Sequence, residues 1–591
     1  MADLIKLTID GKPVEAPPGM LVIDAAKRAG IEVPAFCYWE GLTLQAACRM
    51  CLVEVEKMPK LMASCTLPVA EGMVVRTETP QVAQARKSTL EFLLTNHPLD
   101  CPVCDKGGEC ELQDMVFRYG AGESRYEETK LHVDEKQWSP VVFYDAPRCI
   151  LCFRCVRICN EGMGVGALGI VNRGVVSEIA PNHEDHLECD ECGMCIDICP
   201  VGALTSGAYR YKTRPWEMEH VGAICTHCAD GCKTTLGVRN NEIIRANNRD
   251  HSGINGEFLC IKGRYAFDFY HHPDRLQSPL MKVNGNLEPV SWAQALTAVA
   301  AKFTEIKKRG GKFGIIGSTR TTNEENFYLR KFARLGLETG NVDHHRSGDV
   351  LTLLDALSGG QPHALASTAD LYNKKAVLIV GADLAEEHPF LSFQIRANFR
   401  HHQAHVYVVT EKAVREDRYA AASVRGGPAQ IETLRSKLSA EPELVIVFDD
   451  SVQGDGVRKL VDFGSSLGIP VQYVCLVDYS NSRGAVDMGL LPDPGGLTLD
   501  EMLDATDLDA LWVVGANPFE HTNKLKHVPL LVVQDLFLTE TAQAADIVFP
   551  ASSAYEKSGT VTNVCGEVQR LKKGLQAMGT KPDLEIIGLI A

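Results

Sequence analysis

The cysteines of this 591-residue chain are distributed very unevenly, and this constrains the fold more than any other feature of the sequence. Nineteen of the 21 cysteines lie between Cys37 and Cys260, and only Cys475 and Cys565 follow. Disulfide-rich chains are typically small and secreted. Residues 1–4 show no start of a basic leader followed by an apolar stretch, so we expect no export and reduced, metal-binding thiols in the cytoplasm.

The cysteines and one histidine form five groups with short, regular spacings. The groups are Cys37, Cys48, Cys51 and Cys65; His97, Cys101, Cys104 and Cys110; Cys149, Cys152, Cys155 and Cys159; Cys189, Cys192, Cys195 and Cys199; and Cys225, Cys228, Cys232 and Cys260. Four thiolates, or three thiolates with an imidazole, are ligand sets of iron–sulfur clusters. We therefore expect one [2Fe–2S] cluster in the first group and four [4Fe–4S] clusters overall in the others.

The first group has a long loop between Cys37 and Cys48, whereas the plant-type [2Fe–2S] motif has about four residues there. A zinc site is the alternative, because tetrahedral zinc sites also use Cys-x2-Cys pairs. The same alternative applies to the fifth group, in which 27 residues separate Cys232 from Cys260. The iron–sulfur groups around it favour a [4Fe–4S] cluster there.

The second group contains a histidine where the others have a cysteine. A lone histidine is more often a surface or core residue, but His97 precedes Cys101 by four positions, which favours a ligand. Imidazole in place of thiolate makes the cluster less negative. We therefore expect a raised reduction potential at this cluster.

The third and fourth groups repeat one pattern, Cys-x2-Cys-x2-Cys-x3-Cys, and Pro200 follows the second copy. In two-cluster ferredoxins the fourth cysteine of each run binds the other cluster. We therefore expect Cys159 to join the cysteines at 189–195, and Cys199 to join those at 149–155. Zinc motifs are spaced differently, so two such runs indicate iron.

Local patterns around the first two groups predict their secondary structure. Residues 4–15 alternate apolar and polar around Asp10-Gly11, which predicts a hairpin with a tight turn. A short helix is expected over 21–29, before Gly30, and further helices over 80–120. This beginning is typical of a β-grasp ferredoxin fold.

Beyond Cys260 the sequence changes to apolar, β-branched runs that are followed by helical patterns. These runs are 313–317, 376–381, 406–409, 444–448 and 511–515. Such strands alternating with helices predict parallel sheets covered on both faces, here in two related lobes. No glycine turn after them completes G-x-G-x-x-G, so they do not identify a nucleotide site.

Charge and hydropathy exclude two classes of function. The net charge of −16 opposes binding to nucleic acid, which requires clustered Lys and Arg. No apolar run approaches the roughly 20 residues needed to span a bilayer. No nucleophile with a base, and no pair of catalytic carboxylates, is recognisable among the cysteine groups, so we expect no catalytic residue there.

The order of the groups, together with the segments 248–251 and 257–263, resembles the large iron–sulfur subunits of respiratory complex I, the G subunits of bacterial NADH:quinone oxidoreductases. Two further segments, 545–551 (Ala-Asp-Ile-Val-Phe-Pro-Ala) and 559–563 (Gly-Thr-Val-Thr-Asn), resemble the molybdopterin oxidoreductase superfamily. The resemblance covers nearly the whole chain.

The resemblance implies an α+β N-terminal half followed by an α/β molybdopterin-oxidoreductase-like body. The implied domains are a β-grasp [2Fe–2S] ferredoxin (1–80), a one-His/three-Cys [4Fe–4S] domain (81–140), a two-cluster ferredoxin (141–210), a [4Fe–4S] domain of molybdopterin oxidoreductase type (218–275) and the body (276–591).

The resemblance also implies a role as a subunit of an NADH:quinone oxidoreductase, a translocase. The chain would relay electrons from NADH and flavin toward quinone and would have no substrate site of its own. The implied partners are a flavin- and NADH-binding subunit, further iron–sulfur subunits and, indirectly, a membrane arm. The implied location is peripheral, on the cytoplasmic side of the plasma membrane. The fifth cluster would lie either on the electron route or off it, as a structural relic.

Complete third and fourth groups are a departure from many such subunits and also occur in relatives of NAD-linked formate dehydrogenases and [FeFe]-hydrogenases. Two cysteines after residue 270 are too few for the hydrogenase cluster. A formate dehydrogenase α subunit, the alternative, needs a Cys or selenocysteine on Mo or W, and 340–350 contains none. We therefore expect a body without molybdopterin, with His344 and His345 as surface residues and a structural role for Lys262.

Overall fold

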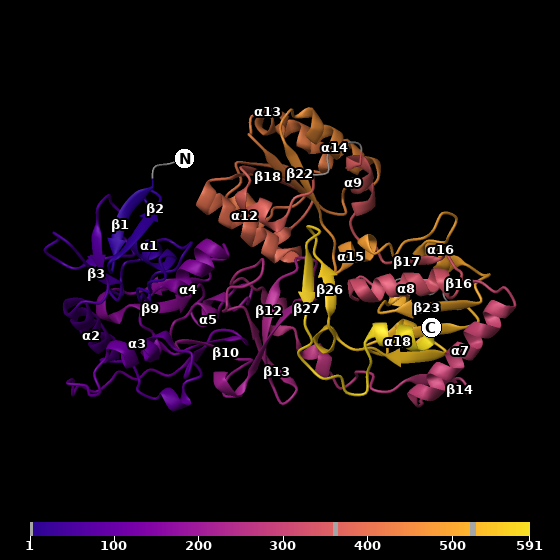
Figure 1. The fold of residues 1–591 in the computed structure, drawn as a ribbon, viewed down its shortest axis with the longest axis horizontal. Coiled ribbons are helices and arrows are strands. Elements are labelled where there is room, and N and C mark those ends of the chain that lie inside the picture. Colours follow the sequence, from indigo (N-terminus) through magenta and orange to yellow (C-terminus); the bar gives the residue numbers. More distant parts are fainter. Residues whose placement is uncertain (1–3, 359–363, 521–527) are drawn as a thin grey trace. The chain divides into compact units, whose positions relative to one another are not determined.

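The computed structural model describes residues 4–358, 364–520 and 528–591. The chain divides into two compact units, Met1–Met218 and Glu219–Ala591, which run from indigo to magenta and from magenta to yellow in Figure 1. Within the described ranges, no helix combines the length and apolar character needed to cross a membrane.

The first unit begins with the hairpin expected from the sequence. β1 (Ile5–Ile9) and β2 (Lys12–Ala16) pair antiparallel, and Asp10 and Gly11 both have positive φ, as a two-residue hairpin turn requires. The sheet has the order β2-β1-β5-β3-β4, with β1 and β5 parallel, and α1 packs against it, as expected of a β-grasp domain. The other elements are α1 (Val22–Arg28), β3 (Leu52–Val55), β4 (Met62–Ala63) and β5 (Val74–Arg76).

Two helices confirm the predicted helical segment. α2 (Pro80–Leu94) begins with proline at its first position, and the Thr79 hydroxyl accepts a hydrogen bond from the Val82 N–H. It packs against α3 (Glu111–Tyr119). The remaining elements of this unit are η1 (Cys101–Val103), β6 (Lys136–Gln137), β7 (Val142–Tyr144), η2 (Ala146–Arg148), α4 (Arg154–Arg157), η3 (Ile158–Gly162), β8 (Leu168–Val171), η4 (Gly174–Val176), β9 (Glu178–Pro181), α5 (Met194–Asp197), β10 (Leu204–Ser206) and η5 (Pro215–Glu217).

The second unit starts with a small antiparallel sheet that carries the fifth cysteine group. Its strands are β11 (Glu219–Ile224), β12 (Lys233–Arg239) and β13 (Glu242–Asn247). The C-terminal strand β27 packs against β11. The elements nearby are α6 (Ile261–Tyr265), η6 (Asp268–His271), η11 (Ala554–Glu556), β26 (Gly559–Thr562) and β27 (Val568–Leu571).

A seven-stranded sheet of order β15-β14-β25-β24-β23-β16-β17 follows. Its elements are β14 (Leu280–Val283), β15 (Asn286–Pro289), α7 (Trp292–Lys308), β16 (Phe313–Gly317), α8 (Asn323–Leu335), β17 (Val342–His344), α16 (Leu499–Asp504), β23 (Ala510–Val514), η9 (Pro518–Glu520), β24 (Leu531–Asp535), α17 (Glu540–Ala544), β25 (Ile547–Pro550) and α18 (Asp583–Ile590). β25 to β17 are parallel, as predicted, whereas β14 and β15 add an antiparallel hairpin at one edge.

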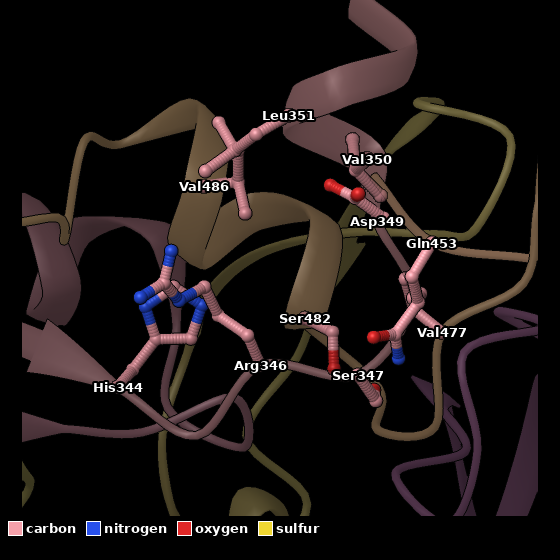
Figure 2. Close-up of a pocket in the computed structure, with 11 residues that line it drawn as sticks. His344, Arg346, Ser347, Asp349, Val350, Leu351, Gln453, Val477, Ser482 and Val486 are labelled. Atoms are coloured by element: carbon pink, nitrogen blue, oxygen red, sulfur yellow. The ribbon is translucent and has the colours of Figure 1, made fainter. Parts of the chain in front are cut away.

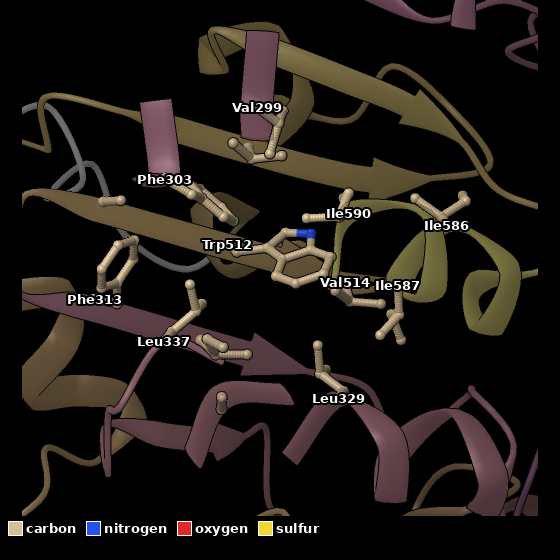
Figure 3. Close-up of a cluster of buried hydrophobic side chains, with 14 of the residues drawn as sticks. Val299, Phe303, Phe313, Leu329, Leu337, Trp512, Val514, Ile586, Ile587 and Ile590 are labelled. Carbon is tan, nitrogen blue, oxygen red and sulfur yellow. The ribbon is translucent and has the colours of Figure 1, made fainter. Parts of the chain in front are cut away.

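Both faces of this sheet are covered, which explains the continuous apolar strands. Trp512 and Val514 share a core with α7, α8 and α18 (Figure 3), whereas Leu511 and Val513 face α16 and α17 on the other side. Successive residues of a strand point to opposite faces, so a strand between two helical layers is apolar at every position.

The second predicted lobe is a five-stranded, wholly parallel sheet of order β20-β19-β18-β21-β22. Its elements and the connecting helices are α9 (Val350–Leu357), α10 (Thr368–Asn373), β18 (Ala376–Val380), α11 (Leu384–Glu387), α12 (Pro389–His402), β19 (His405–Thr410), η7 (Arg415–Arg418), β20 (Ala422–Arg425), η8 (Pro428–Leu434), α13 (Arg435–Leu438), β21 (Leu444–Phe448), α14 (Asp455–Ser466), β22 (Val471–Cys475) and α15 (Ser482–Asp487). The strand runs at 376–381, 406–409 and 444–448 are thus confirmed.

The order of strands in the seven-stranded sheet positions a crevice. From β16 the chain passes to β17 on one side, and it later returns to β23 on the other side of β16. The loops that follow β16 and β23 therefore diverge. In open α/β sheets, ligands bind at the carboxyl ends of strands where the winding reverses in this way.

Candidate metal centres

The first cysteine group is assembled in the β-grasp domain. The Cys51 and Cys65 sulfurs are 3.2 Å apart, and the Phe36 N–H donates to the Cys48 sulfur at 3.3 Å. The pKa of Cys37 is lowered to about 5, chiefly by a hydrogen bond from Cys48, which favours thiolate. The long loop between the first two cysteines folds back so that all four side chains lie together.

The second group lies where two short helical segments begin. Cys101 starts η1, and Cys110 directly precedes α3, where helix N–H groups favour a thiolate. Burial nevertheless raises the pKa of Cys110 to about 11. The helix N–H groups and the burial together fit a metal ligand whose thiol stays neutral until a metal ion balances the charge of the thiolate.

His97 fits a metal ligand by two observations. Burial, and next the charge of Arg148, lower its pKa to about 4, so the ring is neutral at physiological pH. Its Nδ1 atom is buried and has no hydrogen-bond partner in the part of the chain that the structure describes. Buried polar atoms are normally satisfied, so this nitrogen is suited to bind iron.

The third and fourth groups exchange their last cysteines. The pKa of Cys155 is raised first by burial and then by the neighbouring thiolates. These neighbours are Cys152, Cys199 and Cys149, followed by a smaller contribution from Cys195. The first set thus includes the last cysteine of the fourth group, more than forty positions away in the sequence.

The other crossed set is brought together in the same way. Burial raises the pKa of Cys195, and the thiolates that raise it next are Cys192, Cys159 and Cys189, followed by a smaller contribution from Cys199. The Ala167 N–H donates to the Cys159 sulfur at 3.3 Å. The structure therefore places Cys159 with the fourth group, as the spacing predicted.

The two runs have the same backbone shape. Leu151 and Phe153 in one, and Glu191 and Gly193 in the other, have positive φ. The N–H of the residue two after the first cysteine donates to that cysteine's sulfur in both, at 3.4 and 3.3 Å. Three of these four positions are not glycine, so each loop holds costly left-handed backbone to direct N–H groups at sulfur.

The fifth group is also assembled, within the second unit. The thiolates that raise the pKa of Cys232 after burial and Asp230 are Cys228, Cys225 and Cys260. The Cys225 N–H donates to the Cys232 carbonyl at 2.8 Å, which closes the loop. Cys260 arrives from the other end of the domain, directly before α6.

No three His, Cys, Asp or Glu side chains in the described ranges have the arrangement that holds a single metal ion. In an iron–sulfur cluster each thiolate binds one iron, and the four ligands are distributed over two or four irons, so their arrangement differs from that of a single-ion site. The fit of these residues to clusters rests on the thiols brought together in each of the five groups and on the sulfur-directed N–H groups.

Three buried arginines connect the groups of the first unit, and the sequence pattern did not identify them. Arg157 donates to the carbonyls of Cys37 at 2.5 Å and Cys152 at 3.3 Å, and so joins the first and third groups. Arg154 pairs with Glu111 at 2.8 Å. Arg148 pairs with Asp100 at 2.6 Å, next to the second group. The signal available in the sequence was the presence of arginine among the apolar residues in a run of cysteines.

The 340–350 region lies in the second unit beside a cavity of about 200 Å³ (Figure 2). The expectation that His344 is a surface residue was wrong. Its ring is buried, and Nδ1 lies 2.7 Å from the Leu490 carbonyl oxygen. Burial lowers its pKa, so it is a neutral core histidine at the end of β17. His345 is exposed, as expected.

A larger cavity, of about 1080 Å³, lies at the carboxyl ends of β16, β23, β24 and β25, where the sheet winding reverses. Its lining also includes His227, which lies between two cysteines of the fifth group. Among its described lining residues, none is a cysteine. The charged residues of its lining are Arg320, Lys557, Asp500, Asp504, Asp535 and Asp583.

This lining is a poor match for a pyrophosphate-bearing pterin cofactor. Four carboxylates line the cavity, and the ammonium of Lys557 pairs with Glu325 at 2.7 Å and Asp583 at 3.0 Å. Phosphate groups require cationic or N–H donors, and carboxylates repel them. The residues present thus do not fit molybdopterin.

Known families match five consecutive segments of the chain. These are a 2Fe-2S iron-sulfur cluster binding domain (2–80), the NADH-ubiquinone oxidoreductase-G iron-sulfur binding region (86–125), the ferredoxin-like domain of NADH-quinone oxidoreductase subunit 3 (139–205), the molybdopterin oxidoreductase Fe4S4 domain (218–272) and molybdopterin oxidoreductase (275–441 and 450–591).

Relatives of similar length decide the family. The chain is 36% identical over its full length to the second G subunit of NADH-quinone oxidoreductase from Rhizobium meliloti (strain 1021), and the match covers 79% of that protein. The chain belongs to the family of NADH-quinone oxidoreductase G subunits. The G subunit of Rickettsia bellii (strain RML369-C) is 34% identical, over 100% of this chain and 86% of its own length. The mitochondrial NADH-ubiquinone oxidoreductase 78 kDa subunit of Neurospora crassa is 33% identical, over 96% and 77%.

Proposed function

We propose that this chain transfers electrons within a multi-subunit NADH-quinone oxidoreductase, from NADH and flavin toward quinone. The observation that carries the electron-transfer role is the pair of crossed four-cysteine sets, an arrangement used by two-cluster ferredoxins, and the G-subunit relatives support the assignment to an NADH-quinone oxidoreductase. Clusters bound there would supply one-electron exchange with little rearrangement. The residues of the chain hold the thiolates, exclude water from them and set the charge around them.

The proposed cofactors are one [2Fe–2S] cluster on the first group and four [4Fe–4S] clusters on the second group, the two crossed sets and the fifth group. His97 is the proposed imidazole ligand. Arg157 places positive charge between the first group and one crossed set, and positive charge favours the more negative, reduced form of a cluster.

The proposed modules have the boundaries expected above, and the body is proposed to lack molybdopterin. The cavity carboxylates and the absence of cysteine at 340–350 support this. The proposed partners are a flavin- and NADH-binding subunit and further iron–sulfur subunits. The proposed location is peripheral, on the cytoplasmic face of the membrane.

Metal analysis of the purified chain tests the proposal. We expect about 18 irons per chain, from one two-iron and four four-iron centres, with neither Mo nor W. Zinc in place of iron, with no EPR signal after dithionite reduction, would contradict the electron-transfer function.

Two observations favour a formate dehydrogenase α subunit: the complete third and fourth cysteine groups, and the cavity of about 1080 Å³, because such an enzyme needs a large cofactor cavity in its body. Stoichiometric Mo or W together with formate-dependent dye reduction would establish that function instead. We expect neither.

A further inference from the structure

A hairpin in the first unit exposes a group of apolar side chains. β8 and β9 pair antiparallel, and η4 forms their turn. Val175 and Val176 in the turn are 93% and 66% exposed, and Ile170 and Val171 at the end of β8 are 48% and 43% exposed. Val175 and Val176 thus form an exposed apolar tip, and Ile170 and Val171 expose one aliphatic side chain on each face of the hairpin beside it, as at a contact surface.

The base of this hairpin is attached to one crossed cysteine set. Ala167, directly before β8, donates its N–H to the Cys159 sulfur. The segment after β9 returns to the same set, because Asn182 exchanges two hydrogen bonds with the backbone of Glu188, at 3.0 and 3.1 Å. Cys189 follows immediately. The hairpin and the loop after it therefore cover this set.

This region is also strongly acidic. Between Gly174 and Cys199 there are seven Asp and Glu and no Lys or Arg, although the whole chain has 60 Lys and Arg against 76 Asp and Glu. Glu184, Asp185 and Glu188 are exposed. The basic groups nearby are Arg173 in the hairpin, Lys136, whose ammonium pairs with Glu178 at 2.6 Å, and the imidazoles of His183 and His186, each 2.7 Å from a carboxylate oxygen, of Glu188 and Asp185 respectively.

The other ligand sets of this unit have the opposite surroundings. Arg157 adjoins the first group and the other crossed set, and Arg148 adjoins the second group. The charged side chains beside Cys189 are Asp190 and Glu191. Buried arginines thus place positive charge beside three of the ligand sets. The remaining set, which includes Cys189, has carboxylates beside it instead.

We propose that the acidic hairpin surface, formed by Ile170, Val171, Val175, Val176, Glu184, Asp185 and Glu188, docks a small one-electron redox protein with a basic rim around an apolar contact. The proposal rests on the ligand set Cys159, Cys189, Cys192 and Cys195 of the proposed function. One electron moves between the two proteins there, so one centre is oxidised as the other is reduced, and no bond is formed.

The size and charge of the surface favour this occupant over a permanent subunit. Permanent interfaces are large and apolar, whereas transient electron-transfer contacts are small, with charged residues that steer the encounter. A surface of four aliphatic side chains bordered by carboxylates matches a transient electron-transfer contact.

The test uses the full chain with its clusters and a lysine-rich c-type cytochrome as the probe. Binding is measured by calorimetry at low and high salt, and a carbodiimide joins contacting carboxylates to lysines for mapping by mass spectrometry. We expect crosslinks at Glu184 or Asp185. We also expect binding to weaken about tenfold or more in E184K/D185K, and also in V175S/V176S.

Matched controls carry the same changes elsewhere in the unit. E127K/E128K reverses two exposed acidic residues, and L131S removes an exposed aliphatic side chain. Equal weakening in E127K/E128K, or crosslinks away from the hairpin surface, would overturn the docking proposal. Binding of the cytochrome to the isolated chain but not to the assembled complex would also overturn the proposal, because a fixed subunit would then cover the surface.

Iron content separates this proposal from the one on which it rests. About 14 irons in the wild-type chain, with the Cys189 set lacking its cluster, would overturn the ligand assignment. Full iron content with binding unchanged in E184K/D185K would overturn the docking surface alone.

Discussion

At the scale of single residues, the environment of His97 distinguishes a ligand from an ordinary core histidine. A core histidine such as His344 satisfies its ring with a carbonyl, here that of Leu490. His97 is equally neutral, but its buried Nδ1 has no partner among the described residues. Loss of a hydrogen bond at a buried atom costs about 1–3 kcal/mol, which a bond to iron would offset.

Replacing His97 by cysteine tests this assignment. The cluster would gain a negative ligand, so we expect one [4Fe–4S] potential to fall by on the order of 100 mV. EPR-monitored redox titration measures the shift. H132C is the control, because His132 is an exposed histidine of the same domain. An unchanged set of potentials in H97C would remove His97 from the ligands.

A second prediction concerns the close approach of Gly202 to the second group. A β-carbon at Gly202 would overlap the Cys104 sulfur and come within 3.3 Å of Lys106. We expect G202A to lose about four irons, because the sulfur cannot keep its position. Gly122 has open space around its Cα, so G122A should retain full iron content. Equal iron in both variants would show that the loop yields easily.

At the scale of elements, the short helices α4 and α5 make the two crossed sets equivalent. Each follows a left-handed residue, Phe153 or Gly193, and two residues earlier in each loop an N–H, of Leu151 or Glu191, donates to a cysteine sulfur. Each helix is only four residues long, too short to be stable alone. We infer that bound clusters and the surrounding core stabilise these segments.

The exchange between these elements can be tested by single substitutions. We expect C159S to alter the EPR signal of the cluster held at 189–195, and C199S to alter the signal of the cluster held at 149–155. The reason is that each fourth cysteine lies with the other run. Damage by C159S confined to the 149–155 cluster would refute the crossed arrangement.

The end of β24 carries a carboxyl group whose titration should affect stability. The pKa of Asp535 is raised to about 6. Burial is the main cause and the charge of Asp583 adds to it, whereas backbone N–H donors act in the opposite direction. The folded state therefore binds a proton more readily than the unfolded state, whose pKa is about 3.9. Stability should be full below about pH 4 and fall as the pH rises to about 6, by at most about 3 kcal/mol.

The variant D535N removes this titration. We expect its free energy of unfolding to exceed that of the wild type at pH 7 and to lose this advantage at pH 4. Urea unfolding followed by tryptophan fluorescence measures both. D507N is the control, since Asp507 is exposed and its pKa is lowered by Lys312 rather than raised. A pH-independent difference for D535N would contradict the argument.

At the scale of the whole molecule, the chain consists of two compact units with different contents. Met1–Met218 holds the first four ligand groups, and Glu219–Ala591 holds the fifth group, the two parallel sheets and the cavity. No ligand group is divided between the units. Each unit has its own buried cores, which is the condition for independent folding.

Separate expression of the two units tests this division. We expect residues 1–218 to bind about 14 irons and residues 219–591 about four, because the ligand groups are complete in each. Iron analysis and EPR of the two pieces measure this, with the full chain as the control. Loss of the fifth cluster only in the separated piece would show that the second unit depends on the first.

Much of this architecture could be predicted from the sequence because the signals are local. The Asp10-Gly11 turn, the strand runs and the cysteine spacings each extend over few residues, and short spacings fix which side chains can reach one cluster. The repeated spacing of the third and fourth groups also predicted that Cys159 and Cys199 each lie with the other run. The burial of His344 could not be predicted in this way, because it depends on a carbonyl 146 positions away.

The sequence by itself therefore predicted the proposed ligand groups and determined the α/β character of the body, since thiolate spacing and apolar periodicity are properties of neighbouring residues. Only the tertiary structure decided what surrounds them. Arg157 meets Cys37 across 120 positions, the cavity forms where the winding of the sheet reverses, and the acidic hairpin covers one crossed set. Such contacts depend on chain topology, and burial then determines their charge and their hydrogen bonds.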